Sequence, residues 1–335
     1  MKFSVVTPLW QDRPAAENMD VAIAADRLGF PELWIGEMAT YDAFAFATAV
    51  GHRTEKIALS IGPLPVGVRT PMTMAMGIAS VADLTGRPTG LALGASSTVV
   101  VEQWHGRARA RTARQLDETA QIVRGLLAGE KVDFSGETVS CRGYRLRLAA
   151  VRSPLTVAAF GPAAVRVAAR RADRMLLNMV TPQSLGRLRA ELVAEAQAAG
   201  RPVPQLAVWL TCAVDPEPAA IQQLLQAIVG YLAAPGYGEM ISEAGFAGLV
   251  EFARTRPHPR ELLAAMPQEL VAAIGLVGTE AEIRRRLEEY RAAGADEICL
   301  VPATAGDPGG TRTLATMGKR LPALYQPLGA GVTQS

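Results

Sequence analysis

Lysine is scarce in this sequence: only four of the 34 basic residues are lysines, and the other 30 are arginines. Together with the abundance of alanine, this imbalance indicates the coding bias of a GC-rich genome rather than a binding site. The formal net charge is only +2, so the chain has no strong field that concentrates a nucleic acid or an anionic membrane at its surface. We therefore expect no nucleic-acid partner.

Cysteine is also rare, because Cys141, Cys212 and Cys299 are the only three and they form no C-x-x-C pair. This excludes a disulfide framework and a cysteine zinc site, and it is typical of a reducing compartment. No apolar run reaches the ~18 residues that a membrane span needs, and the first residues contain no apolar signal segment. The expected location is the cytoplasm, without a membrane partner.

Several familiar motifs are missing. There is no Walker loop, and no G-x-G-x-x-G opens a helix after a predicted strand, which disfavours the common nucleotide-binding folds. The three histidines, His52, His105 and His258, lack metal-ligand spacing, so we expect no metal site. Residues 94–97 (GASS) do not form a G-x-S-x-G elbow, and their serines are better suited to bind a ligand by hydrogen bonds.

Short β-branched runs alternate with alanine-rich helical stretches along the chain. This alternation predicts the α/β class, with a parallel sheet and helical crossovers, and eight such units favour a closed (β/α)8 TIM barrel. The predicted strands are 3–7, 32–36, 57–62, 89–94, 155–160, 175–178, 206–212 and 297–301. The predicted helices are about 16–29, 42–53, 70–85, 111–127, 161–172, 182–199, 216–233 and 279–293.

Two insertions interrupt this rhythm. Residues 130–148 alternate in polarity around two glycines, which predicts a β-hairpin, and we expect it to cover one end of the barrel. Residues 234–267 are rich in glycine and proline and predict irregular helices and loops, a pattern typical of lids and oligomer contacts. With these insertions, residues 1–326 form one predicted domain, and the glycine-rich residues 327–335 form a predicted flexible tail.

Barrel enzymes carry their sites at the carboxyl ends of the strands, so the residues that follow each predicted strand are the candidates. Residues 62–65 (GPLP) can neither extend a strand nor start a helix, and they predict a bulge with a possible cis peptide. A backbone shelf against a flat ring and an ordinary rigid turn both fit this spacing. Residues 158–162 (AAFGP) predict free backbone N–H groups at a helix start, which fits phosphate binding or a plain helix cap.

Two side chains are candidates for proton transfer. Glu37 ends an apolar strand, where it can carry a proton, accept a ligand N–H or cap the helix that starts near Asp42. His105 lies between Trp104 and Arg107, close enough to the fourth strand to turn back over the barrel mouth. It is the best single candidate for a titrating group, and a structural loop histidine or a subunit contact is the alternative.

Taken together, these stretches resemble the luciferase-like barrel oxidoreductases, in particular the branch that uses the deazaflavin coenzyme F420. The stretches that carry the resemblance span nearly the whole chain. They are residues 24–34 (AADRLGFPELW), 54–59 (TEKIAL), 69–71 (RTP) with 79–86, 94–97 (GASS) with 104–107 (WHGR), 158–162 (AAFGP) and 292–296 (AAGAD).

The resemblance implies a strand-three bulge under the deazaflavin ring, a segment after strand four that flanks the ring, and a phosphate turn after strand five. It also implies a homodimer and a small-molecule substrate. The residues that it assigns to cofactor binding are Gly62, Pro63, Leu64, Gly94, Ala95, Ser96, Ser97, Ala158, Ala159, Gly161 and Pro162.

The sequence departs from the family pattern at two positions, one of which is Ser97, near which some relatives have a carboxylate. Family dehydrogenases commonly have an acidic residue followed by histidine after strand two, whereas this chain has Glu37-Met38, which leaves Glu37 and His105 as the candidate catalytic residues. The expected activity is hydride transfer between F420 and a small organic substrate, since the cofactor carries the difficult chemistry. An FMN-dependent monooxygenase and a barrel that binds a cofactor without turnover are the two alternatives.

Overall fold

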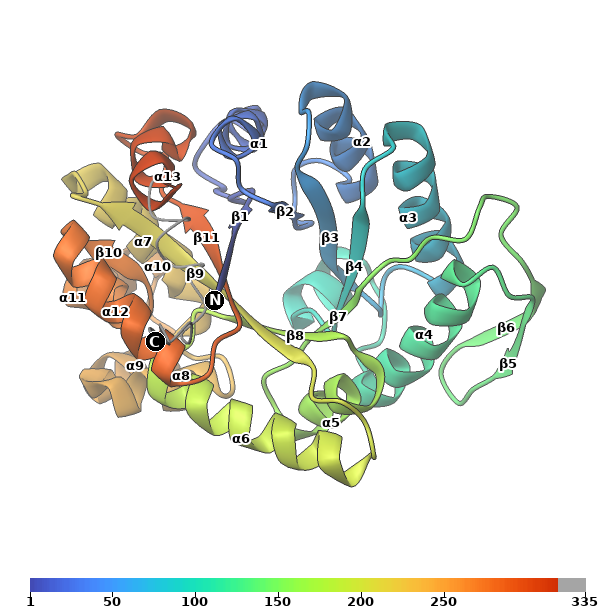
Figure 1. Ribbon diagram of the computed structural model, residues 1–335. Coiled ribbons are helices and arrows are strands. Elements are labelled where there is room, and N and C mark those ends of the chain that lie inside the picture. Colours follow the sequence, from blue (N-terminus) through green and yellow to red (C-terminus); the bar gives the residue numbers. More distant parts are fainter. Residues whose placement is uncertain (319–335) are drawn as a thin grey trace, which may run out of the picture.

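The computed structural model describes residues 1–318, and its centre is a closed barrel of eight parallel strands (Figure 1). The ring closes because β9 pairs with β8 on one side and with β11 on the other. The predicted (β/α)8 barrel is therefore confirmed. Its strands are β1 (Lys2–Val6), β2 (Glu32–Ile35), β3 (Ala58–Pro65), β4 (Thr89–Gly94), β7 (Leu155–Ala158), β8 (Arg174–Asn178), β9 (Gln205–Val214) and β11 (Glu297–Pro302).

Helices surround the barrel, and local signals fix where they begin. Asp42, Thr70, Thr181 and Thr279 each accept backbone N–H bonds at a helix start, and proline occupies the first turn of four of the helices. These helices are α1 (Glu17–Arg27), α2 (Ala43–Arg53), α3 (Pro71–Thr85), α4 (Thr112–Leu127), α5 (Pro162–Arg171), α6 (Pro182–Ala198), α7 (Pro218–Ile228), α12 (Glu280–Ala292) and α13 (Thr311–Gly318).

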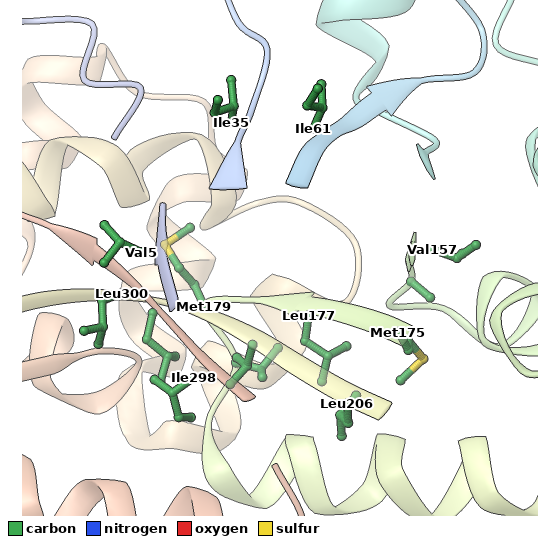
Figure 2. Close-up of a cluster of buried hydrophobic side chains, with 14 of the residues drawn as sticks. Val5, Ile35, Ile61, Val157, Met175, Leu177, Met179, Leu206, Ile298 and Leu300 are labelled. Atoms are coloured by element: carbon green, nitrogen blue, oxygen red, sulfur yellow. The ribbon is translucent and has the colours of Figure 1, made fainter. Parts of the chain in front are cut away.

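Alternate residues of each strand point outward and form the main hydrophobic core between strands and helices. Val5, Ile61, Val157, Leu177 and Leu300 are fully or almost fully buried there, and Figure 2 shows them on strands from around the barrel. The period of two that drives this burial also directs the intervening residues into the barrel. The side chains inside the barrel therefore belong to different residues from those of the outer hydrophobic core.

The barrel interior changes character from its amino end to its carboxyl end. At the amino end, the Arg174 guanidinium bonds to Glu32 and Glu297, and Lys2 also pairs with both carboxylates. Above this charged layer lies a small apolar cluster that includes Trp34 and Leu176. The charged layer closes the bottom of the barrel, so the open end is the carboxyl end.

Residues 130–148 contain the predicted hairpin, β5 (Val132–Ser135) and β6 (Ser140–Tyr144), but its position differs from the expectation. It packs against α4 on the outside of the barrel instead of covering an end (Figure 1). The reason is Glu118 of α4, whose buried carboxylate accepts hydrogen bonds from the backbone of Glu137, Thr138 and Val139 in the hairpin turn. The hairpin is thus tied to a helix.

Residues 234–267 form short helices, as predicted. A short strand, the ninth strand of the main sheet, follows them. This strand, β10 (Leu276–Gly278), pairs with the carboxyl end of β9 and was missed because three residues show no periodicity. The short elements of this region are η2 (Val229–Tyr231), α8 (Tyr237–Ile241), η3 (Ser242–Phe246), α9 (Ala247–Arg254), α10 (Pro259–Ala265) and α11 (Glu269–Ala273), and η4 (Pro308–Gly310) precedes α13. The predicted tail, 327–335, lies outside the described residues.

Candidate functional site at the barrel mouth

Glycines end three neighbouring strands on one side of the barrel mouth. Gly36, Gly62 and Gly94 stand at the carboxyl ends of β2, β3 and β4. An added Cβ at Gly36 would lie 2.9 Å from the Leu9 side chain, and one at Gly94 would lie 3.0 Å from the Pro63 side chain. Because these three positions carry no side chain, a planar group can approach the backbone of the strand ends beside Leu9 and Pro63.

The bulge predicted in β3 is present. The pairing between β3 and β4 shifts register between Ile61 and Leu64, and the Gly62–Pro63 peptide is cis. Gly62 has φ +116°, and a Cβ there would come within 2.3 Å of the Ala92 carbonyl oxygen, so only glycine fits. The strand therefore presents its backbone to the mouth at this point.

The segment after β4 forms the rim beside the three glycine strand ends. Ser96 has a left-handed φ of +56°, and its carbonyl oxygen accepts a hydrogen bond from Arg109 Nε at 3.1 Å. The Ser97 hydroxyl accepts the Val100 N–H at the start of the π-helical turn η1 (Val99–Trp104). Ser97 thus caps a turn, while Gly94 and Ala95 keep their backbone at the mouth.

The turn after β7 leaves several backbone donors free. The N–H groups of Phe160, Gly161 and Ala163 donate to no acceptor within residues 1–318. Gly161 is the N-cap of α5, and an added Cβ there would contact nothing within 4 Å. Free N–H groups at the positive end of a ten-residue helix are suited to an anion such as phosphate.

The opposite side of the mouth is crowded with aromatic side chains. Phe160 stacks on Tyr237 with ring centroids 4.7 Å apart, and Tyr231 meets Tyr237 edge-on at 4.9 Å. Asn178, at the end of β8, donates from Nδ2 to the Tyr231 hydroxyl at 3.4 Å. Sequence reasoning missed both tyrosines, because they lie at the edge of an insertion with no periodic pattern and no chemical motif.

Glu37 lies in an ion pair rather than free at the mouth. Arg69 Nε donates to Glu37 Oε1 at 2.9 Å, and the same guanidinium also bonds to Asp42. Glu37 additionally accepts the Ala43 N–H at the start of α2. The two carboxylates raise the pKa of Arg69 further above its already high value. Burial acts in the opposite direction but is outweighed, so the cation is permanent.

His105 lies directly after η1, in an exposed segment that includes the last residues of η1 and runs to Arg111. Its backbone N–H bonds to the Val100 carbonyl, which fixes the loop start. The neighbouring Trp104 is 53% exposed, so this aromatic side chain is available for a ligand or a second protein. Within residues 1–318, Glu37 and His105 share no hydrogen bond or ion pair, so the structure does not bring the two candidate proton carriers together.

No group of three or more His, Cys, Asp or Glu side chains in residues 1–318 is placed to hold a metal ion. Among these residues no helix combines the length and the apolar character needed to cross a membrane.

A barrel with a bulge in its third strand and free backbone N–H groups after β7 defines a class of barrel proteins. The sequence comparison identifies the same class. Residues 1–297 match the luciferase-like monooxygenase family, and the chain belongs to this family. The predicted family is therefore confirmed.

Three known proteins illustrate what this chain is similar to. The chain is 24% identical to the 5,10-methylenetetrahydromethanopterin reductase of Methanolobus tindarius, over 69% of this chain and 71% of that protein. It is 30% identical to the F420-dependent glucose-6-phosphate dehydrogenase of Mycolicibacterium fortuitum, over 61% of this chain and 63% of that one. The coenzyme F420-dependent tetrahydromethanopterin reductase of Methanopyrus kandleri shares the fold, with a TM-score of 0.80 at 18% identity, covering 97% of this chain and 100% of that chain.

Proposed function

We propose that this protein is an F420-dependent oxidoreductase that transfers a hydride between the deazaflavin coenzyme and a small organic substrate. The observation that carries the proposal is the placement of three glycine strand ends, Gly36, Gly62 and Gly94, in the same barrel mouth as the free N–H groups that start α5. A flat ring and a phosphate joined by a short linker need both features. The relatives named for F420 support the choice of cofactor.

The residues present fit this group. The backbone at Gly62, Pro63 and Leu64 would support the ring, and the segment from Gly94 to Ser97 would flank it. The turn from Ala158 to Pro162 would bind the phosphate through the N–H groups of Phe160, Gly161 and Ala163. When bound, the deazaflavin supplies the hydride chemistry, and the protein positions the reactants and excludes water.

Proton transfer is assigned to Glu37 or His105. Glu37 pairs with Arg69 and accepts the Ala43 N–H, so it can take part in proton transfer only when a ligand competes for these bonds. His105 is exposed, and it reaches substrate only when its loop folds over the mouth. Both residues therefore depend on ligand binding to become active in this role.

The test of the cofactor is a tryptophan-quenching titration of the purified protein with F420 and, in parallel, with FMN. The chain has four tryptophans, and Trp209 lies at the mouth, where its ring would be 3.6 Å from a Cβ at Gly36. Saturable quenching by F420 alone is the expected result. Preference for FMN would replace the proposal by a flavin monooxygenase, and binding without hydride transfer to any acceptor would indicate a carrier.

We also propose that the protein is a homodimer in the cytoplasm. Met76 and Leu84 on α3 are 48% and 60% exposed, and their spacing of eight residues puts them on one side of the helix. A second copy of the chain would cover this apolar surface. The cytoplasm fits three cysteines that are free and buried. Light scattering of wild type and Leu84→Lys tests the dimer, which the charged variant should dissociate.

A further inference from the structure

A pair of tyrosines caps the strands β7 and β8. Tyr231 and Tyr237 lie on either side of the turn between η2 and α8, and Phe160 holds them through its stack on Tyr237. A Cβ at Gly236 would come within 2.4 Å of the Phe160 ring, so the turn lies directly on that side chain. The two phenols are therefore fixed above the carboxyl ends of these strands.

Asn178 places this cluster inside the mouth. Along β8, Arg174 and Leu176 point into the barrel, where Arg174 bonds to Glu297 and Leu176 joins the interior cluster. Asn178 continues this inward set by the period of two. Its amide donates to the Tyr231 hydroxyl, and Tyr237 meets the Tyr231 ring edge-on, so both aromatic side chains lie beside this inward position.

The protons of the two phenols have no acceptor. Within residues 1–318 neither the Tyr231 nor the Tyr237 hydroxyl donates to a carbonyl or carboxylate oxygen. Trp209 of β9 pairs in register with Asn178, and its Nε1 atom is buried and has no hydrogen-bond partner in the same part of the chain. Trp209 thus carries a buried donor without a partner, and the protons of the two half-buried phenols are free to bind a ligand.

The other buried aromatic donors among residues 1–318 are matched. Trp10 Nε1 donates to the Pro302 carbonyl at 3.1 Å, Trp34 Nε1 to Ser4 Oγ at 3.1 Å, and the Tyr290 hydroxyl to the Val180 carbonyl at 2.7 Å. A buried donor without a partner is costly, and such groups concentrate where a ligand completes the hydrogen bonding. Trp209 Nε1, at the mouth, lacks the partner that each of these three donors has.

The chemistry of the donors of Tyr231, Tyr237 and Trp209 determines which kind of ligand atom they bind. Burial raises the pKa of both tyrosines above its ordinary value near 10, so both keep their protons at neutral pH. Indole N–H is a donor only. A cluster of neutral donors binds an uncharged oxygen acceptor, of which a carbonyl oxygen is the most common.

We propose that Tyr231, Tyr237 and Trp209 form a donor site that binds a carbonyl oxygen of the ligand in the barrel mouth. This inference rests on the proposed function in one respect, because it takes the barrel mouth as the place where the reaction occurs. The oxygen belongs either to a ketone- or aldehyde-type substrate or to the pyrimidine ring of the cofactor. In the first case the donors polarise the carbon that receives the hydride, and in the second they orient the ring.

The test uses Tyr231→Phe and Tyr237→Phe, which keep the ring packing and remove only the hydroxyl. Tyr144→Phe, in the distant hairpin strand β6, is the matched control. Two dissociation constants are measured for each variant: that of F420 by tryptophan quenching, and that of cyclohexanone by ligand-observed NMR with and without F420. Methylenecyclohexane, which has the same shape without the oxygen, is the reference probe. Thermal unfolding by circular dichroism confirms that each variant is folded.

We expect at least one of the two tyrosine variants to weaken one ligand by about fivefold, the effect of one lost hydrogen bond, while Tyr144→Phe matches wild type. Weaker F420 binding assigns the oxygen to the cofactor, and weaker ketone binding alone assigns it to the substrate. The inference is overturned if both variants keep wild-type affinity for both ligands, or if wild type binds neither. Tyrosine-dependent ketone binding without any F420 binding keeps the donor site and removes the proposed cofactor, whereas F420 binding without tyrosine dependence does the reverse.

Discussion

The guanidinium of Arg174 lies 4.1 Å from the centroid of the Trp34 ring inside the barrel. The same guanidinium bonds to Glu32 and Glu297, and the Trp34 indole donates to Ser4. Arg174 therefore joins the charged bottom of the barrel to the aromatic layer beneath the mouth.

Replacing Arg174 should lower the free energy of unfolding more than replacing a surface arginine does. Burial raises the pKa of Glu32, but the hydrogen bonds and charge of Arg174 outweigh it and hold that pKa at about 2. Arg174→Met leaves two buried carboxylates without their main cation, and we expect a loss of about 3–5 kcal/mol in the free energy of unfolding. Urea denaturation measures it, with Arg170→Met on the exposed face of α5 as control. Equal midpoints for the two variants would contradict the structural role.

Glu118 should make the hairpin sensitive to acid. Burial alone raises the pKa of this carboxyl, but hydrogen bonds from Thr138 and from three backbone N–H groups outweigh it and hold the pKa at about 2, against an ordinary 4.5. Because the folded-state pKa is depressed, its stabilisation is complete above pH 4.5 and is lost as the pH falls from there towards 2.

Hydrogen exchange of the hairpin amides checks this behaviour. In wild type, exchange at residues 137–139 should accelerate below pH 4.5 relative to the intrinsic rate. Glu118→Gln should exchange fast at every pH and lose about 2 kcal/mol of stability. Glu137→Gln, whose side chain is exposed, is the control, and the idea fails if this control shows the same loss of protection.

Gly161→Asp should separate phosphate binding from stability. Position 161 is the N-cap of α5 with φ −87° and ψ 159°, a conformation that aspartate adopts readily and in which it caps a helix well. We expect unchanged or higher thermal stability, but at least about tenfold weaker F420 binding, because the carboxylate occupies the free N–H groups and repels the phosphate. Thr279→Asp at the N-cap of α12 is the control. Unchanged affinity in Gly161→Asp would move the phosphate site elsewhere.

Gly94→Val should block the glycine strand ends at the mouth. The new Cβ would lie 3.0 Å from the Pro63 side chain, so the larger side chain must extend over the ring surface. We expect F420 binding to disappear from quenching titrations, with a stability loss of about 1–3 kcal/mol from overpacking. Gly90→Ala, four residues earlier on the same face of β4, crowds Ser60 instead and should lose stability while it keeps binding. Retained binding in Gly94→Val would exclude this surface as the ring site.

Glu37→Gln and His105→Gln should identify the proton carrier once a substrate is known. The variant that removes the carrier should lower kcat by about 100-fold or more and abolish one limb of the pH profile. Arg69→Met is the control for position, because it frees Glu37 from its ion pair without removing the carboxylate. A similar pH profile in wild type and both glutamine variants would assign proton transfer to a different group.

The local sequence predicted the eight barrel strands, the main helices and the bulge, but not β10 or α13. Apolar residues at every second position predict the buried strands, and residues such as Thr70 and Pro71 mark a helix start by their own hydrogen-bonding capacity. Position 62 needs glycine for a steric reason that acts over a short distance. The hairpin was also predicted, but its attachment to Glu118 was not, because one buried carboxylate in a helix carries no sequence signal.

The sequence by itself determined the order of the barrel units and the mouth residues contributed by strand ends, because both follow from local periodicity and turn chemistry. Only the tertiary structure decided which inward residues meet. Arg174 and Glu32 are 142 positions apart, and Asn178 and Tyr231 are 53 apart, so neither contact has a spacing that a periodic pattern can reveal. Closure of the sheet brings these side chains together, and it is closure that leaves the donors of Tyr231, Tyr237 and Trp209 facing a common mouth.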